Sequence, residues 1–198
     1  MTKYKELWLM RHGRNYLDGD NQRFGIWQPH SKLTFDGIAE VAEVHKTHLK
    51  GRKFSYLAHS PYDRTRETAM VALPGGKWVS SDAIAPCMQE RVDEWAKKKP
   101  QPFVLQSVLE IEEALPGFLE AEKQWIGMAC DEVLETLRSG QSALLVGHQP
   151  HITLFRSLHE EGFHPFNQPL PKAGIYRMIF DGDDNFIQTV ELNPPPFK

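Results

Sequence analysis

The chain has 198 residues, of which 40% are hydrophobic and 25% charged, the proportions of a globular protein with a buried core. Its formal net charge is −3 and no long Lys/Arg block offsets it, which argues against a nucleic-acid partner. Cys87 and Cys130 are far apart and in no metal-binding spacing. We expect a single domain over 1–198 that is cytoplasmic and has no membrane partner.

The first part of the chain alternates segments typical of strands and helices. Residues 7–10 form a continuous apolar run, which predicts a strand buried on both faces. Residues 14–32 are polar and rich in Gly, Asn and Asp, as in a long loop. A helix is expected from Thr34, a plausible N-cap, to Leu49, and a second strand over 54–58.

The rest of the chain continues the alternation. The predicted elements are, in order, a helix beginning near Pro61, a short strand within 78–84, helices over 104–114 and 118–137, a strand over 143–146, a helix over 152–158 and strands over 175–180 and 186–192. This order favours an α/β fold, a three-layer α/β/α sandwich with a mostly parallel central sheet. Ligands of such sheets bind beyond the carboxyl ends of the strands.

Basic and imidazole side chains follow three of the predicted strands. Arg11 and His12 come after the first, Arg64 shortly after the second, and His148 after the strand over 143–146. Parallel strands would bring these side chains to one edge of the sheet. Two arginines can hold an anion with forked hydrogen bonds, and imidazoles supply donors or a nucleophile. The set suits a phosphoryl group, whose transfer depends on positioning and on charge neutralisation.

Four segments resemble, in the same order, the signatures of the histidine phosphatase superfamily, also called the phosphoglycerate mutase-like family. They are Arg11-His12-Gly13, Leu33-Thr34-Phe35-Asp36-Gly37, the stretch from Ser60 to Ala69, and Val146-Gly147-His148. The compact length and the turn Gly147-His148-Gln149-Pro150-His151 look closer to the small phosphatase branch of that family. The resemblance implies a phosphoglycerate mutase-like fold.

The resemblance also implies roles. His12 would be the nucleophile that carries the phosphoryl group, while Arg11, Arg64 and His148 would bind the phosphoryl oxygens. His148 would thereby also take part in catalysis. Asn15 stands where the family often has Ser or Thr lining the phosphate pocket, so it too is expected to bind the phosphate.

A carboxyl group is expected to protonate the leaving group and then to activate water. Met88-Gln89-Glu90-Arg91 is similar to the family segment that carries this group, so Glu90 is the predicted general acid. Asp93 and Glu94 are close enough to compete, and some small phosphohistidine phosphatases have no carboxylate there. Asp18 falls where the family usually has Asn.

The predicted function is therefore a phosphatase that hydrolyses a phosphomonoester or a phosphoramidate of a small molecule or of a phosphoprotein. No cofactor and no metal are expected, since His148 and His151 lack a third ligand in suitable spacing. The alternatives are a phosphoglycerate mutase-type phosphotransferase and a catalytically weak module that binds phosphorylated ligands. Neither the substrate nor the oligomeric state follows from the sequence.

Overall fold

A six-stranded mixed sheet forms the centre of the computed structural model, which describes residues 4–16, 30–87, 91–92, 94–95, 98, 108–165 and 170–194. The strands are β1 (Lys5–Arg11), β2 (Tyr56–His59), β3 (Val79–Ser80), β4 (Ser142–Gly147), β5 (Ile175–Phe180) and β6 (Phe186–Leu192). Their order across the sheet is β3-β2-β4-β1-β5-β6. The first four strands in this order are parallel to one another. β5 pairs antiparallel with β1, and β6 pairs antiparallel with β5.

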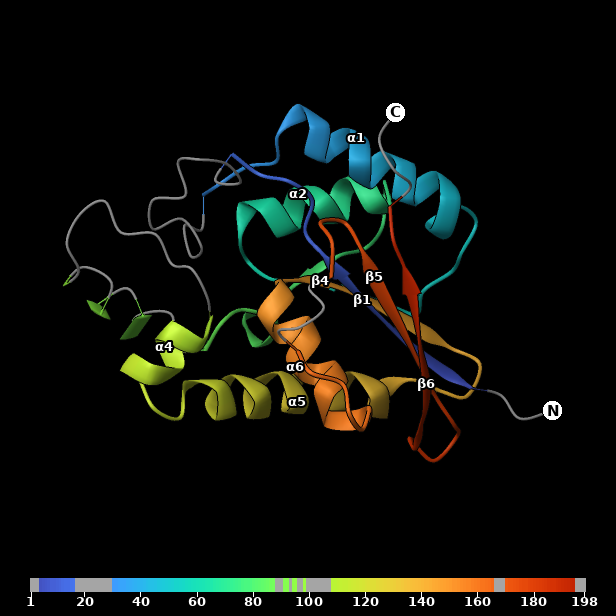
Figure 1. Ribbon diagram of the computed structural model, residues 1–198. Coiled ribbons are helices and arrows are strands. Elements are labelled where there is room, and N and C mark those ends of the chain that lie inside the picture. Colours follow the sequence, from blue (N-terminus) through green and yellow to red (C-terminus); the bar gives the residue numbers. More distant parts are fainter. Residues whose placement is uncertain are drawn as a thin grey trace.

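Helices cover both faces of the sheet (Figure 1). The helical elements are α1 (Phe35–Val44) with the π-helical turn η2 (His45–Leu49), α2 (Asp63–Ala72), the 3-10 turn η3 (Asp82–Ile84), α4 (Val108–Ala114), α5 (Phe118–Thr136) and α6 (Gln149–His159). In Figure 1, α1 and α2 lie on one side of the sheet, and α5 and α6 lie on the other. The predicted three-layer architecture with a mostly parallel sheet is thus confirmed.

The core has one main cluster on each face of the sheet, and β1 contributes to both. Trp8 and Met10 pack in the cluster that includes residues of α1 and α2. Leu7 and Leu9 pack in the cluster that includes residues of α5 and α6. Successive side chains of a strand point to opposite faces, so a strand covered on both sides has an uninterrupted apolar sequence.

Most predicted elements are present, with shifted ends. The Oγ1 of Thr34 accepts a hydrogen bond from the Gly37 N–H at 3.0 Å, so the predicted N-cap is confirmed. β2 lies two residues later than predicted at its start, and β3 has only two residues. α6 begins at Gln149 rather than at 152, because Pro150 fits the first turn of a helix, where its missing N–H costs no hydrogen bond. Residues 104–107 lie outside the described part of the chain.

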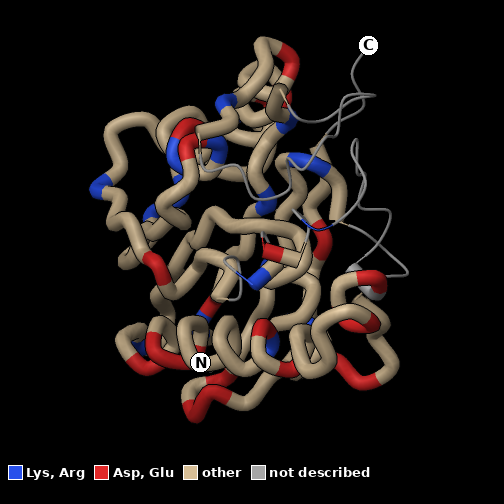
Figure 2. Tube along the Cα trace, turned by 90° about the vertical axis from the view of Figure 1, so that its left-hand side faces the viewer, with Lys and Arg blue, Asp and Glu red and all other residues tan. Residues whose placement is uncertain are grey.

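Acidic residues recur along the lower part of the tube in Figure 2, on the side where α4 and α5 lie. Among the described residues, no helix combines the length and the apolar character that crossing a membrane requires.

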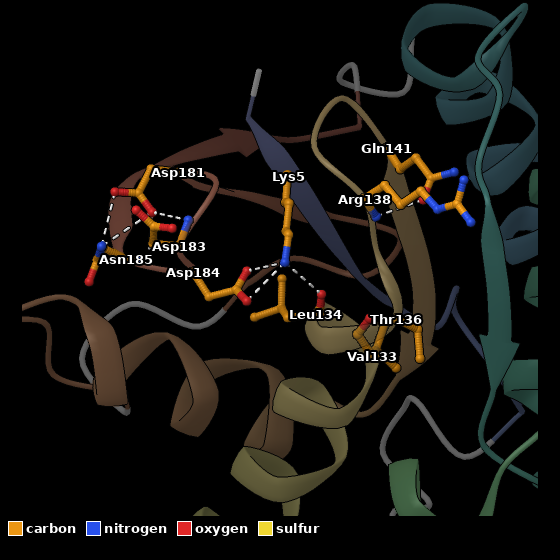
Figure 3. Close-up of polar contacts among 10 residues, drawn as sticks. All are labelled: Lys5, Val133, Leu134, Thr136, Arg138, Gln141, Asp181, Asp183, Asp184 and Asn185. Atoms are coloured by element: carbon orange, nitrogen blue, oxygen red, sulfur yellow. Dashed lines mark hydrogen bonds and ion pairs between the residues drawn. The ribbon is translucent and has the colours of Figure 1, made fainter. Parts of the chain in front are cut away.

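A lysine joins the amino end of β1 to the turn between β5 and β6 (Figure 3). Lys5 is buried, and its Nζ lies 2.7 and 2.9 Å from the two carboxylate oxygens of Asp184, in the turn between β5 and β6. The same ammonium donates to the backbone oxygen of Leu134 near the end of α5, at 3.2 Å. One side chain therefore joins the first strand, the last hairpin and a helix.

We expect Lys5→Met to lower the free energy of unfolding by about 1 kcal/mol, because the Leu134 carbonyl and the Asp184 carboxylate lose their shared donor. The loss stays small since Asp184 is 36% exposed and water screens its charge. Urea denaturation of this variant and of Lys50→Met, at an exposed lysine, measures the effect. Equal midpoints for the two variants would contradict it.

Candidate active site

The candidate site forms where β1, β2 and β4 end side by side. Beyond the paired residues Arg11 and Gly147, the His12 N–H donates to the Gly147 carbonyl at 3.1 Å. The Ser60 N–H likewise donates to the Val146 carbonyl at 3.0 Å. The two predicted histidines consequently face each other, and the ring centroids of His12 and His148 are 5.4 Å apart.

Two glycines let the chain after β1 pass close to α1. A Cβ on Gly13 would lie 2.8 Å from the Val41 side chain and 3.0 Å from the Gly37 carbonyl oxygen. A Cβ on Gly37 would lie only 2.1 Å from the carbonyl oxygen of Arg14. Both glycines belong to the sequence segments that point to this site, and here their function is to permit a close backbone approach.

His12 is buried, and its ring is oriented by its own neighbour. The Nδ1 atom lies 2.8 Å from the Gly13 carbonyl oxygen, which can only accept a hydrogen bond. Nδ1 therefore carries the proton, and the lone pair is on Nε2. Asn15 is also buried and has its amide nitrogen 3.4 Å from the same Nδ1, while its Oδ1 accepts from the Ser31 hydroxyl at 3.2 Å. Asn15 thus contacts the back of the histidine ring.

His148 is held by groups from β2 and α2. The Arg64 guanidinium, which can only donate, lies 3.3 Å from Nδ1, so Nδ1 accepts. Nε2 then carries the proton and donates to Ser60 Oγ at 2.8 Å. Ser60 Oγ is 3.1 Å from Thr65 Oγ1, which donates onward to backbone oxygens. Tyr62 completes the enclosure, with its ring centroid 4.9 Å from that of His148 and its face 4.8 Å from the buried guanidinium of Arg64.

The turn that precedes β5 also lies at this sheet edge. Arg11 donates through NH1 to the Leu170 carbonyl, and the Ala173 N–H donates to the His12 carbonyl at 3.2 Å. Ala173 is buried with φ of 58°, a conformation that costs an L-residue roughly 1–2 kcal/mol. Lys172 lies between these contacts, so its cationic side chain belongs to the surroundings of both histidines.

Burial and positive neighbours keep both imidazoles neutral. Burial lowers the pKa of His12 well below its ordinary value of 6.5, and the charges of Lys172, Arg64 and Arg11 lower it further. Burial likewise lowers the pKa of His148, with Arg64 the strongest neighbouring charge. A cationic site that holds an unprotonated imidazole can accept an anion and present a nitrogen lone pair to it.

These pKa shifts predict how stability depends on pH. Below about pH 6.5 the unfolded chain binds protons on His12 and His148, whereas the folded chain does not. The free energy of unfolding therefore decreases as the pH falls. The two residues together add a slope of up to about 2.7 kcal/mol per pH unit until their folded pKa values are reached. Denaturation of the wild type and of His12→Gln/His148→Gln between pH 7 and 5 measures the slope. The double variant should have the flatter profile; a profile as steep as that of the wild type would contradict the assignment.

The other predicted site residues fall mainly beyond the part described. Glu90, Asp93 and Asp18 lie outside the described residues, and Glu94 is exposed. Within the described residues, no group of three or more His, Cys, Asp or Glu side chains is arranged to hold a metal ion.

Several groups at the site had no role in the sequence prediction. Ser60 and Thr65 were part of a quoted segment, and their hydroxyls complete the hydrogen-bond chain from His148. Tyr62 contacts both His148 and Arg64. Nothing local marks Lys172, because it precedes its strand whereas the other site residues follow theirs.

Comparison with known families gives one decisive match. The sequence model of the histidine phosphatase superfamily (branch 1) matches residues 7–193, nearly the whole chain. The chain belongs to this superfamily. The resemblance to this superfamily that four short sequence segments indicated is thereby confirmed. No protein in the curated collection matches the chain.

Solved structures of phosphatases and of a phosphoglycerate mutase have the same fold. A phosphoglycerate mutase from Bacillus anthracis str. Sterne is 21% identical with a TM-score of 0.70, covering 96% of this chain and 93% of that one. A phosphoserine phosphatase from Entamoeba histolytica, in complex with 3-phosphoglyceric acid, is 16% identical with a TM-score of 0.66 and covers 98% of each chain. The protein histidine phosphatase SixA, complexed with tungstate, is 17% identical with a TM-score of 0.58, covering 96% and 97%. Phosphatases and mutases thus share this architecture.

Proposed function

We propose that the protein is a phosphatase that hydrolyses a phosphomonoester or a phosphoramidate through a phosphohistidine on His12. The observation that carries the proposal is the orientation of the His12 ring. Its Nδ1–H is engaged by the Gly13 carbonyl at 2.8 Å, which leaves the Nε2 lone pair available beside His148 and the buried Arg64.

In the first step, Nε2 of His12 attacks phosphorus as the bond from phosphorus to the leaving oxygen or nitrogen breaks. Arg11, Arg64 and His148 bind the phosphoryl oxygens, and Lys172 adds positive charge nearby. A bound phosphoryl dianion favours a proton on His148, whose Nδ1 then donates to a phosphoryl oxygen instead of accepting from Arg64. Asn15 contacts the His12 ring at Nδ1, the nitrogen that does not attack phosphorus.

In the second step, water attacks phosphorus, the N–P bond breaks, and inorganic phosphate leaves. The leaving group of the first step needs a proton, and the attacking water must lose one. We assign this acid and base function to Glu90, with Asp93 and Glu94 as the competing carboxylates. Phosphoramidate substrates need the acid least, because imidazole is a good leaving group.

The substrate class is a phosphorylated small molecule or a phosphoprotein. The related structures support both, since one is named a phosphoserine phosphatase and another a protein histidine phosphatase. A phosphotransferase of the mutase type needs the same nucleophile, so the distinction depends on whether water or a second substrate receives the phosphoryl group.

The test is release of inorganic phosphate from p-nitrophenyl phosphate, phosphoserine and a phosphohistidine peptide by the wild-type protein. We expect turnover on at least one of them. Isomerisation of 3-phosphoglycerate only when 2,3-bisphosphoglycerate is present, without release of inorganic phosphate, would identify a mutase instead. Tight binding of inorganic phosphate with no turnover on any of these compounds would identify a module that only binds phosphorylated ligands.

A further inference from the structure

A buried acid and a buried histidine lie directly behind His148. Glu122 on α5 and His151 on α6 form a hydrogen-bonded pair through Oε2 and Nε2. Each side chain is only 1% exposed. The proposed chemistry uses neither residue, and a buried pair of this kind is weak as a source of stability, because its desolvation cost offsets much of its attraction.

His151 is close to the candidate site by its place in α6. His148 is the N-cap of α6, and His151 is the third helical residue after it. The two rings meet edge to face, with centroids 6.3 Å apart and planes at 75°. Fixing His151 therefore fixes the first turn of α6, which carries His148.

Glu122 also holds the backbone segment that follows η3. Its Oε2 accepts a hydrogen bond from the Cys87 N–H at 3.2 Å. One turn further along α5, Trp125 donates through its indole N–H to the Ala85 carbonyl at 3.1 Å. The chain that α5 holds at 85–87 leads directly into Glu90, the carboxylate assigned as the acid.

We infer that Glu122 and His151 are a positioning pair for phosphoryl transfer, which holds His148 from behind and anchors the chain that leads to Glu90. This inference rests on the proposed function. Both residues act through others: His151 through the His148 ring and the α6 turn, and Glu122 through His151 and the Cys87 N–H.

The pair also contributes charge. The titratable and charged groups that face His148 are Arg64 of α2, Tyr62 at the start of α2, Arg11 and His12 at the end of β1, Lys172 before β5 and His151 of α6, with Glu122 of α5 behind His151. Arg64, Arg11 and Lys172 are positive, so the negative Glu122 carboxylate opposes the field that disfavours a proton on His148. Removing that negative charge should make His148 harder to protonate when phosphate binds.

The experiment compares Glu122→Gln and His151→Phe with Glu120→Gln, an exposed residue of the same helix. Glutamine keeps an acceptor for the Cys87 N–H, whereas phenylalanine keeps a flat ring but leaves the buried Glu122 carboxylate without its imidazole donor, so thermal unfolding is used to check that each variant is folded. We expect kcat on p-nitrophenyl phosphate to fall at least tenfold in each variant. The pH profile of kcat should move to lower pH in Glu122→Gln, a change that a loss of packing alone does not produce.

Binding of inorganic phosphate, measured by calorimetry from pH 5 to 8, gives a second readout that needs no turnover. We expect its optimum to move to lower pH in Glu122→Gln and its affinity to drop at least threefold in His151→Phe. Glu120→Gln should have the turnover and the phosphate binding of the wild type. If Glu122→Gln and His151→Phe have them too, the inference is wrong. If the wild-type protein has no turnover, the proposed function is wrong. The phosphate-binding measurements then test by themselves whether Glu122 and His151 position His148.

Discussion

His12→Ala is expected to reduce phosphate release by a factor on the order of 10⁴ or more, since it removes the atom that would form the covalent bond. Alanine fits the space without a new polar group, and the backbone contacts of His12 with Gly147 and Ala173 do not involve the ring. The protein should therefore fold and still bind inorganic phosphate through its arginines. Initial rates on p-nitrophenyl phosphate, with active protein quantified by phosphate binding, measure the effect.

A second measurement identifies the intermediate itself. Wild-type protein that is quenched during turnover of ³²P-labelled substrate should retain label that survives alkali and is lost in acid, the behaviour of an N–P bond. His12→Ala should retain none. His48→Ala, which changes a histidine at the end of η2, is the matched control and should label like the wild type. Full turnover by His12→Ala would show that another residue is the nucleophile.

The sequence predicted the part of the site that is built from the carboxyl ends of parallel strands. Arg11, His12 and His148 directly follow apolar runs, and an apolar run of strand length is a strong local signal. Parallel pairing then brings them to one edge without any knowledge of tertiary contacts. The placement of Arg64 follows from the same logic, since α2 begins a few residues after β2.

Lys172 could not be predicted in this way. It precedes β5, which runs antiparallel to β1, so the beginning of β5 meets the end of β1 at the same edge. Nothing in the local sequence reveals the direction of the fifth strand. The direction depends on how the final hairpin packs, and only then does a residue in front of a strand enter the site.

The pairing of Glu122 with His151 could not be predicted for a different reason. On α5, a glutamate among apolar residues has the pattern of a polar position at the edge of a buried stripe, and exposure is the usual outcome for such a residue. Its burial depends on one partner 29 residues away and on a backbone N–H 35 residues away. Pairings of this kind depend on which helices pack against each other. Hydrophobic periodicity shows which face of a helix is buried but not which partner covers it.

Arg64 should show the second large effect. Its guanidinium is buried beside His148 and over the Tyr62 ring, where a planar fork of donors can bind a phosphoryl group and the imidazole together. We expect Arg64→Met to lower kcat/KM by about 10²–10³-fold, the usual cost of removing one charged donor from a transition state. Arg64→Lys should recover only part of this loss, because an ammonium keeps the charge but not the fork.

Arg66 provides the control, since it is on the same helix, exposed and paired with Asp63. Arg66→Met should change kcat/KM less than about threefold, the range expected for an exposed ion pair. The ordering of the three variants separates charge from geometry. If Arg64→Lys matched the wild type, the positive charge alone would suffice. If Arg64→Met matched Arg66→Met, the buried guanidinium would have no part in binding the phosphoryl group, and its contact with His148 would be structural.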